Sequence, residues 1–282
     1  MIVAFDFGIT NTDLVIKDQS IIKDQSIKYL SVPSPFDRKN GNFDITERQV
    51  IEILENLDIN IKEIVSIGVT GGKSADLPDS ICDVPVTKIN EIDAIGKGAR
   101  SLYKISEESA LVVSSGTGTA CVHIHDDATN HLGGISVGGG MLEGLSKLLV
   151  DNSYGIEINN FAEKGNRKIL DVMIGEAVNE IGNLNAEITA ANFAKARNES
   201  INSVENISAS LCNMIGEVIG TVAYLNALLV GSNKAYFLGR TSMLSEVKKG
   251  IDARLALAGI EGIYHENRAF GNAIGVLDTI DI

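Results

Sequence analysis

A short segment near the start of the sequence combines a glycine with hydroxyl, amide and carboxylate side chains, as a phosphate-binding turn requires. It runs from Asp6 to Asp13. Gly8 permits a tight turn, after which backbone amides can point at phosphate oxygens. Side-chain donors follow at Thr10, Asn11 and Thr12. Asp6 ends an apolar strand-forming run and could hold hydrated Mg²⁺, although a plain hairpin whose polar side chains serve only the turn is the alternative.

A second segment provides the same groups about a hundred residues later. Apolar, strand-forming runs flank it on both sides, which weakens the alternative of a flexible connector. Its phosphate-binding candidates are Gly116, Thr117, Gly118 and Thr119. Two such hairpins, each opening a lobe, are typical of a duplicated ATPase fold. We therefore expect the chain to bind ATP.

A third glycine cluster precedes an apolar segment with helical spacing that begins near Met141. It consists of Gly133, Gly134, Gly138, Gly139 and Gly140. Exposed amides at a helix start, together with the helix dipole, attract an anion. For Gly133 and Gly134, tight packing is an equally good interpretation.

Glu91 is the carboxylate best placed for acid–base chemistry. It stands at a predicted helix start, directly after a short strand-like segment. There it could accept the proton of an alcohol that attacks the γ-phosphate of ATP. The alternative is an acidic residue that only complements the helix N-terminus.

These residues need an α/β framework of two lobes. In the first lobe, residues 1–108, we expect a hairpin over residues 2–16, extended through a local duplication at 17–27. A loop over 34–42, helices over 46–57 and 90–104, and a strand over 64–69 complete it. In the second lobe, residues 109–282, a new hairpin starts at Ser109. We expect helices over 142–150 and onward to Ala227, a strand over 235–238, and a final strand–helix unit.

Composition excludes several classes of protein. The chain has 282 residues and is 44% apolar and 22% charged, which fits neither a disordered chain nor a coiled coil. A net charge of −13 argues against a nucleic-acid partner. The start Met1-Ile2-Val3 lacks a signal peptide's basic region, and no apolar run reaches the roughly twenty residues of a membrane helix, so we expect a cytoplasmic protein. We interpret the three cysteines as reduced core residues: Cys82, Cys121 and Cys212.

The sequence resembles the type II and eukaryotic-type pantothenate kinases of the actin/hexokinase/Hsp70 superfamily. The resemblance spans nearly the whole chain, and GGGMLEGLSKLL after GTGT is specific to that family. Its segments are FDFGITNTD (5–13), GVTGGKS (68–74), INEIDAIGKG (89–98), SSGTGTA (114–120), LGGISVGGGMLEGLSKLL (132–149), ITAANFAKA (188–196), AYFLGR (235–240) and AFGNAIGVL (269–277).

The resemblance implies a two-lobed actin-like ATPase (ribonuclease H-like) fold with mixed sheets flanked by helices and ATP in the inter-lobe cleft. It implies an ATP-dependent kinase of pantothenate, the first step of coenzyme A biosynthesis, and a homodimer with a long helix near 209–229. Glu91 would be the base. Asp6, Gly8 and Thr10 would meet the phosphates and Mg²⁺, Thr117 the acceptor and phosphates, Gly138 to Gly140 the nucleotide, and Gly239-Arg240 the adenosine end.

One departure concerns the acceptor site. Where the family has an arginine that binds the acceptor's carboxylate, this chain has His131, followed by Leu132 and the candidate acceptor contacts Gly133 and Gly134. Histidine is a poorer carboxylate clamp than a bidentate guanidinium. Arg100 or Arg167 could compensate.

Other functions stay open. The alternatives are a kinase of another small alcohol or sugar and a non-kinase ATPase or activator. An activator that holds an iron–sulfur cluster would need a pair of cysteines, which this sequence does not obviously supply. We expect His123 and His125 to be a surface pair on one side of a strand, and His265 to lie in a loop without a catalytic role.

Overall fold

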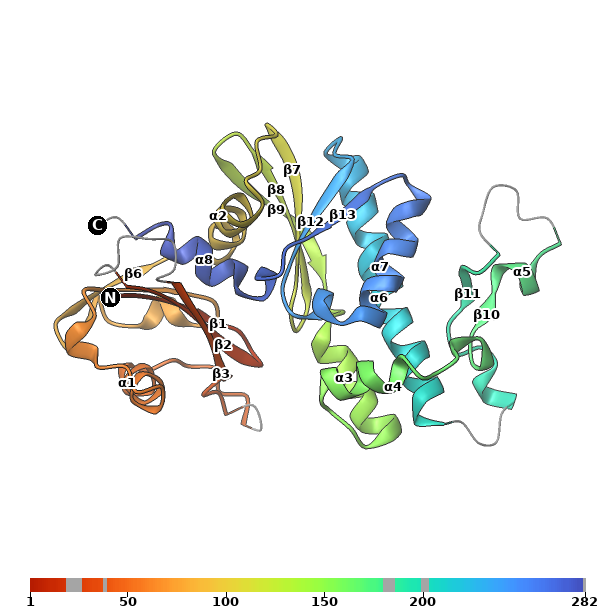
Figure 1. The fold of residues 1–282 in the computed structure, drawn as a ribbon, viewed down its shortest axis with the longest axis horizontal. Coiled ribbons are helices and arrows are strands. Elements are labelled where there is room, and N and C mark those ends of the chain that lie inside the picture. The colour runs from red at the N-terminus through yellow and green to blue at the C-terminus, as the bar shows by residue number, and fades with distance from the viewer. Residues whose placement is uncertain (19–26, 38–39, 180–185, 199–202, 281–282) are drawn as a thin grey trace. The chain divides into compact units, whose positions relative to one another are not determined.

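The structure, a computed structural model, describes residues 1–18, 27–37, 40–179, 186–198 and 203–280 (Figure 1). It contains two compact units. The first unit comprises Met1–Glu108, Val122–His131 and Tyr264–Ile282, and the second unit comprises Ser109–Cys121 and Leu132–Ile263.

The first unit is built on a six-stranded sheet in the order β3-β2-β1-β4-β6-β5. Its strands are β1 (Ile2–Phe7), β2 (Asn11–Lys17), β3 (Ile27–Pro33), β4 (Ser66–Thr70), β5 (Ser80–Ile81) and β6 (Val84–Lys88). β1, β2 and β3 pair antiparallel, whereas β1 with β4 and β4 with β6 pair parallel. The predicted hairpin is confirmed. The predicted extension through the local duplication falls on residues 19–26, outside the described residues.

The two faces of β1 are buried against different partners. Val3, Phe5 and Phe7 belong to one apolar cluster with α1 (Glu47–Asn56), which starts with a capping box formed by Thr46 and Gln49. Ile2 and Ala4 belong to a second cluster, which contains residues of α2 (Glu91–Tyr103) and α8 (Gly271–Leu277). Because side chains alternate along a strand, Asp6 lies on the α2 and α8 face.

Glycines let α2 and α8 approach very closely. A Cβ on Gly98 would collide with the carbonyl oxygen of Gly271, and one on Gly275 would collide with that of Ala94. No larger residue fits between the two backbones at these points. The pair covers the face of the sheet on which Asp6 lies.

A five-stranded sheet has the order β13-β12-β7-β8-β9. Its strands are β7 (Ser109–Ser115), β8 (Thr119–His125), β9 (Ala128–Ile135), β12 (Lys234–Leu238) and β13 (Glu261–Tyr264). β7 and β12 pair parallel. Written from β9, this order repeats that of β3-β2-β1-β4-β6, with β7 in the place of β1. The predicted duplication and the actin-like ATPase fold are confirmed.

The second unit carries most of the remaining helices. They are α3 (Gly139–Val150), α4 (Gly155–Ala162), α5 (Ile174–Ala177), α6 (Val204–Leu229) and α7 (Ser245–Leu257), with the short strands β10 (Val172–Met173) and β11 (Thr189–Ala191). The predicted helix over 142–150 and strand over 235–238 are confirmed.

Helix α6 corrects one expectation from the sequence. The helix has 26 residues and contains an 18-residue stretch with a mean hydropathy of 1.3, so it is long and apolar enough to cross a membrane by length and composition alone. Half of that stretch is buried within the structure. Glu217, on this helix, pairs with Arg254 of α7 at 3.1 Å. These features are typical of the core helix of a folded domain.

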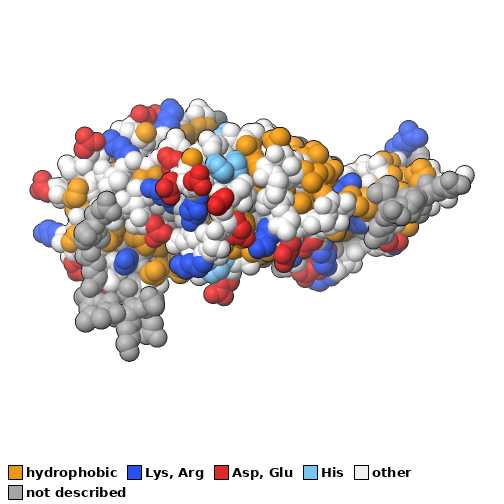
Figure 2. Space-filling model, turned by 90° about the horizontal axis from the view of Figure 1, so that it is seen from above, with side chains coloured by type: hydrophobic (Ala, Val, Ile, Leu, Met, Phe, Trp, Pro, Cys, Tyr) orange, Lys and Arg blue, Asp and Glu red, His pale blue; other side chains and the backbone are white. Residues whose placement is uncertain are grey.

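Acidic and basic side chains are interspersed on the face drawn in Figure 2 and do not form a basic strip there. This distribution agrees with the net charge of −13. That the chain binds no nucleic acid stays a prediction.

Candidate active site

The first predicted phosphate turn lies between β1 and β2. Phe7 faces Thr12 across the hairpin. Thr12 is fully buried, and its hydroxyl lies 3.0 Å from that of Ser34, whose amide donates to the carbonyl of Thr10 at 3.1 Å. The Thr12 hydroxyl therefore contacts the residue that holds the turn, and it is not exposed to a ligand. Of the predicted donors, Thr10 and Asn11 remain half-buried.

Asp6 is half-buried at the end of β1, directly opposite Asp13 on β2. Opposed residues of an antiparallel pair project from the same face. Asp13 is only 6% exposed, so a second carboxylate lies beside the predicted metal ligand. The site assignment from sequence missed Asp13, although the register of a hairpin with its turn at residues 8–10 would have indicated it.

The turn after β4 packs against Asp6. Gly71 has a φ of +75°, and a Cβ there would lie 2.6 Å from Asp6 Oδ1 and 2.9 Å from the carbonyl oxygen of Phe7. Both the backbone conformation and the space require glycine. The segment quoted as GVTGGKS thus supports the first phosphate turn.

Glu91 is the first residue of α2, as the sequence predicts. Asn90 caps the helix by accepting a hydrogen bond from the amide of Ile92 at 2.9 Å. By its surface area Glu91 is an exposed residue. Even so, removal of water by the surrounding protein raises the pKa of its carboxyl, and the charge of His131 opposes this shift. A raised pKa is typical of a general base that works near neutral pH.

Helix α2 contacts β9, the strand that carries His131. A Cβ on Gly96 would lie 2.6 Å from Thr129 Oγ1, so helix and strand touch there. Glu91 starts the same helix and His131 lies two residues after Thr129 on the same strand, and the charge of His131 acts on the Glu91 carboxyl. The structure therefore brings together two predicted site residues that are forty positions apart in the sequence.

The second predicted phosphate turn lies between β7 and β8 and packs against the start of α3. The amides of Gly139 and Gly140 donate to the carbonyl oxygens of Gly116 and Thr117, at 2.8 and 3.0 Å. A Cβ on Gly138 would lie 2.7 to 2.9 Å from the carbonyl oxygens of residues 116–118. The three glycines therefore permit close contact between two backbones.

This contact corrects the expectation that the α3 amides are exposed to an anion. The first two are already bound by carbonyl oxygens of the hairpin. Two more hydrogen bonds fix the same turn, from Thr241 Oγ1 to the carbonyl of Gly116 at 2.7 Å and from Thr119 Oγ1 to that of Val137 at 2.8 Å. Thr117 and Gly118 are half-buried and Gly116 is exposed at the tip.

The other glycines among the predicted site residues lie in different surroundings. Gly239, with a φ of +86°, lies against the backbone of Ser115 at the base of the second hairpin. Gly134 on β9 lies against the carbonyl of Thr119. Gly133 has a φ of +123° and open space where a side chain would be. Gly8 lies against the carbonyl of Asn11, across the first turn.

Both arginines suggested as substitutes for the acceptor clamp make hydrogen bonds within the protein. The guanidinium of Arg100 donates to the carbonyl of Asp126. Arg167 donates to Thr189 Oγ1 and to the carbonyl of Glu187, both at 2.6 Å, within the second unit.

The cysteines are not all core residues. Cys121 and Cys212 are buried, and burial raises the pKa of their thiols to about 11 and about 12, which keeps them protonated at neutral pH. Cys82 is exposed, which corrects its assignment to the core. It stands with Asp83 in a two-residue turn where both residues have positive φ.

The histidines outside the site agree with expectation. His123 and His125 stack on one side of β8 with ring centroids 5.7 Å apart. Burial, and then the charge of His125, lowers the pKa of His123. His265 accepts a hydrogen bond from the amide of Asn267 at 3.0 Å and packs edge-on against Tyr103, in the loop before α8.

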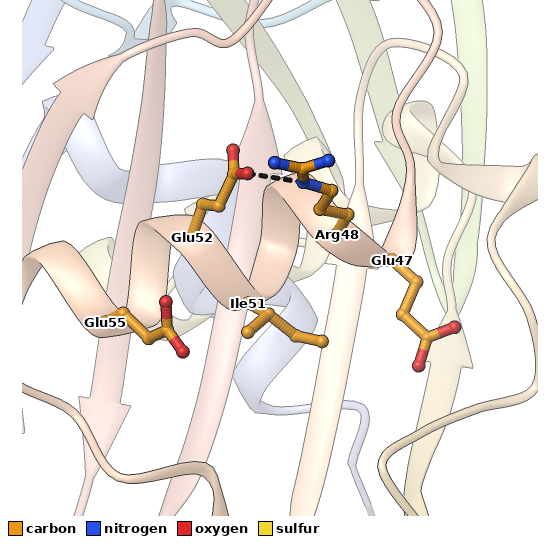
Figure 3. Close-up of a pocket in the computed structure, with 5 residues that line it drawn as sticks. All are labelled: Glu47, Arg48, Ile51, Glu52 and Glu55. Atoms are coloured by element: carbon orange, nitrogen blue, oxygen red, sulfur yellow. Dashed lines mark hydrogen bonds and ion pairs between the residues drawn. The ribbon is translucent and has the colours of Figure 1, made fainter.

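A surface pocket on α1 lies apart from these residues. Figure 3 shows its lining, which comes from a single helix: Glu47, Arg48, Ile51, Glu52 and Glu55. Arg48 pairs with Glu52 at 2.7 Å, and both side chains are exposed. None of the predicted site residues lines it.

The sequence matches the model of the Fumble family over residues 39–248, more than half of the chain. The chain belongs to the Fumble family. Glu91, Thr117, His131 and the triple glycine lie within the matched residues, whereas the first phosphate turn precedes them. A relative from Staphylococcus epidermidis, named type II pantothenate kinase, is 29% identical over 229 residues, covering 78% of this chain and 85% of the relative.

Solved structures resemble the fold of this Fumble-family chain. The ADPNP-bound activator of 2-hydroxyisocaproyl-CoA dehydratase from Clostridium difficile has a TM-score of 0.62 at 14% identity, covering 97% of this chain and 91% of that one. A ROK family glucokinase from Streptomyces griseus, with glucose and AMPPNP, has a TM-score of 0.56 at 11% identity and covers 98% and 97%. An activator and a kinase share this fold, so the fold alone does not select between them.

Proposed function

We propose that this chain is an ATP-dependent kinase that phosphorylates the hydroxyl of pantothenate, or of a close analogue, in the first step of coenzyme A biosynthesis. The observation that carries the proposal is Glu91. The pKa of its carboxyl is raised. Glu91 is also the first residue of α2, the helix that covers the Asp6 face of the sheet, and it lies within the residues that match the Fumble family. The type II pantothenate kinase relative supports pantothenate as the acceptor.

In the proposed reaction, the Glu91 carboxylate accepts the proton of the acceptor hydroxyl. The hydroxyl oxygen forms a bond to the γ-phosphorus, the bond from that phosphorus to the bridging oxygen breaks, and ADP leaves. His131 would contact the acceptor beside Glu91, with Gly133 and Gly134 on the same strand. Thr117 and the amides of the two hairpin turns would contact the phosphates.

Asp6 fits a magnesium ion by its chemistry. Mg²⁺ in kinases is held by one or two carboxylates together with substrate phosphates and water. Among the described residues no group of three or more His, Cys, Asp or Glu could hold a metal ion alone. Asp6, half-buried with Asp13 opposite, supplies the carboxylate oxygens that such a shared site needs. When bound, Mg²⁺ neutralises charge on the β- and γ-phosphates.

The proposal includes a cytoplasmic homodimer. Its support is an exposed apolar surface at the end of α6, where Leu225, Leu228 and Leu229 are 53%, 57% and 73% exposed. Sedimentation analysis of the purified chain and of the variant Leu228→Glu/Leu229→Glu tests the dimer. A wild-type monomer at micromolar concentration would contradict it.

An assay of ADP release with a panel of acceptors tests the activity. Wild-type protein with Mg-ATP should release ADP when pantothenate is added, and mass spectrometry should detect phosphopantothenate. Glu91→Gln should lower kcat by at least about a hundredfold, since general base catalysis contributes 10² to 10⁴. Asp93→Asn, in the same helical turn and exposed, is the matched control and should stay near wild type.

The outcomes separate the alternatives. Phosphorylation of a different alcohol or sugar would reject pantothenate but not the kinase. ATP hydrolysis that needs a protein partner and no small acceptor would favour an activator ATPase. Normal turnover by Glu91→Gln would reject Glu91 as the base.

A further inference from the structure

Thr70 joins the two halves of the proposed catalytic centre in the first unit. It is the last residue of β4 and is fully buried. In the parallel pairing of β1 with β4, Thr70 stands beside Asp6. Since paired residues of neighbouring strands project from the same face, its side chain shares the face with Asp6 and points toward the side that α2 covers.

The hydroxyl of Thr70 holds the segment that leads into α2. It donates to the carbonyl oxygen of Ile89 at 2.9 Å. The amide of Ile89 donates in turn to the carbonyl of Val69 at 2.9 Å. These two hydrogen bonds attach Ile89 to the end of β4, from the side chain and from the backbone.

Glu91 follows Ile89 by two residues. Between them, Asn90 caps the helix. Its side chain accepts a hydrogen bond from the amide of Ile92, and its carbonyl oxygen accepts one from the amide of Ala94 at 3.0 Å. The start of α2 is thus fixed by hydrogen bonds from Asn90 onward. Its attachment to β4, the strand that pairs parallel with β1, includes the side-chain hydrogen bond of Thr70.

We infer that Thr70 is a positioning residue for phosphoryl transfer, whose hydroxyl sets the place of Glu91 relative to Asp6 by holding the Ile89 carbonyl. The inference rests on the proposed function, in which Glu91 is the base and Asp6 the metal ligand. A displacement of about 1 Å in a reacting group lowers the rate by up to about a hundredfold. A hydroxyl at residue 70 therefore acts on the rate without contacting the substrate.

Four residues at position 70 separate the hydroxyl from the packing. Threonine and serine carry the hydroxyl, whereas valine and alanine lack it; threonine and valine share one shape, and serine and alanine lack a methyl group. Thr70→Ser should keep kcat within about twofold of wild type. Thr70→Val and Thr70→Ala should lose about tenfold or more in kcat, with little change in the KM for ATP.

Two further measurements report on Glu91 itself. In Thr70→Val and Thr70→Ala the start of α2 is released and Glu91 gains water, so its pKa should fall and the acid limb of the kcat profile should move to lower pH. Hydrogen exchange of the amides at residues 90–94 should be faster in these variants than in Thr70→Ser. A change of stability alone would move neither the acid limb nor the ratio of kcat to KM in this way.

Equal losses of kcat in the serine, valine and alanine variants would show that packing matters, and would overturn the inference. Wild-type kcat in Thr70→Val would overturn it as well. Thermal unfolding of each variant identifies any that does not fold. The comparison of serine with alanine and that of valine with wild type each test the hydroxyl, so one of them remains if a variant of the other does not fold. If the wild-type protein phosphorylates no acceptor, the proposed function fails, and faster exchange at residues 90–94 in the alanine variant still decides whether Thr70 holds the helix.

Discussion

Gly71 lies against the carboxylate of Asp6, so close that a Cβ on Gly71 would be 2.6 Å from Asp6 Oδ1. The contact joins the turn after β4 to the end of β1. It leaves the Asp6 carboxylate only a narrow range of positions. Gly71 is therefore part of the support for the proposed metal ligand.

Gly71→Ala should displace Asp6 and lower kcat/KM for Mg-ATP by about tenfold or more. The positive φ of +75° adds a conformational cost of about 1–2 kcal/mol. Gly72→Ala is the matched control, because Gly72 also has positive φ but faces Phe36 and Phe7 rather than Asp6. The assay is ADP release against Mg-ATP concentration, and equal losses in the two variants would contradict a specific effect on Asp6.

Glu91→Gln should stabilise the protein at neutral pH while abolishing activity. Glu91 is exposed by its surface area, but the surrounding protein removes enough water from its carboxyl to raise its pKa in the folded protein. Folding therefore favours the protonated carboxyl, and this contribution is complete below the unfolded pKa and lost as pH rises through the folded pKa. The variant should match wild type near pH 3.5 and unfold at a higher temperature near pH 8. Thermal unfolding at both pH values checks the sign; a destabilised variant at pH 8 would contradict it.

Local features were predictable from the sequence. The two hairpins, the start of α2 at Asn90 and Glu91, and the helix after the triple glycine follow from short-range patterns of apolar spacing, turn residues and caps. Their positions in the structure agree with those patterns.

Contacts between distant segments were not predictable in this way. Nothing in the sequence near Gly139 shows that its amide binds the carbonyl of Gly116, and nothing near Glu91 shows that His131 is close. Both depend on how helices pack on a sheet. Cys82 is a similar case, since the lack of any pairing or metal-ligand spacing suggested a core cysteine, while a tight turn places it at the surface.

His131 should control the pH dependence of the reaction. Its charge lowers the pKa of Glu91. Replacing it by alanine should therefore raise that pKa and move the acid limb of kcat to higher pH. His131→Arg should keep the limb low and lower the KM for pantothenate by about tenfold, since hydrogen bonds between charged groups are strong. Initial rates between pH 5 and pH 8 measure both effects. An alanine variant with an unshifted or lowered acid limb would contradict this coupling.

Arg254→Met should destabilise the second unit far more than an equivalent change on the surface. Arg254 pairs with Glu217 at 3.1 Å, and the Glu217 side chain is only 4% exposed. Without Arg254, a buried carboxylate loses its partner, which costs about 3–5 kcal/mol. Arg48→Met is the control, because the Arg48–Glu52 pair is 88% and 50% exposed and is worth about 0–1 kcal/mol. Urea unfolding measures the free energy of unfolding of both variants. The double variant Arg254→Met/Glu217→Leu should recover most of the stability lost in Arg254→Met, because it removes the buried charge together with its partner. Equal effects of the two single variants would show that the buried pair contributes no more than an exposed one.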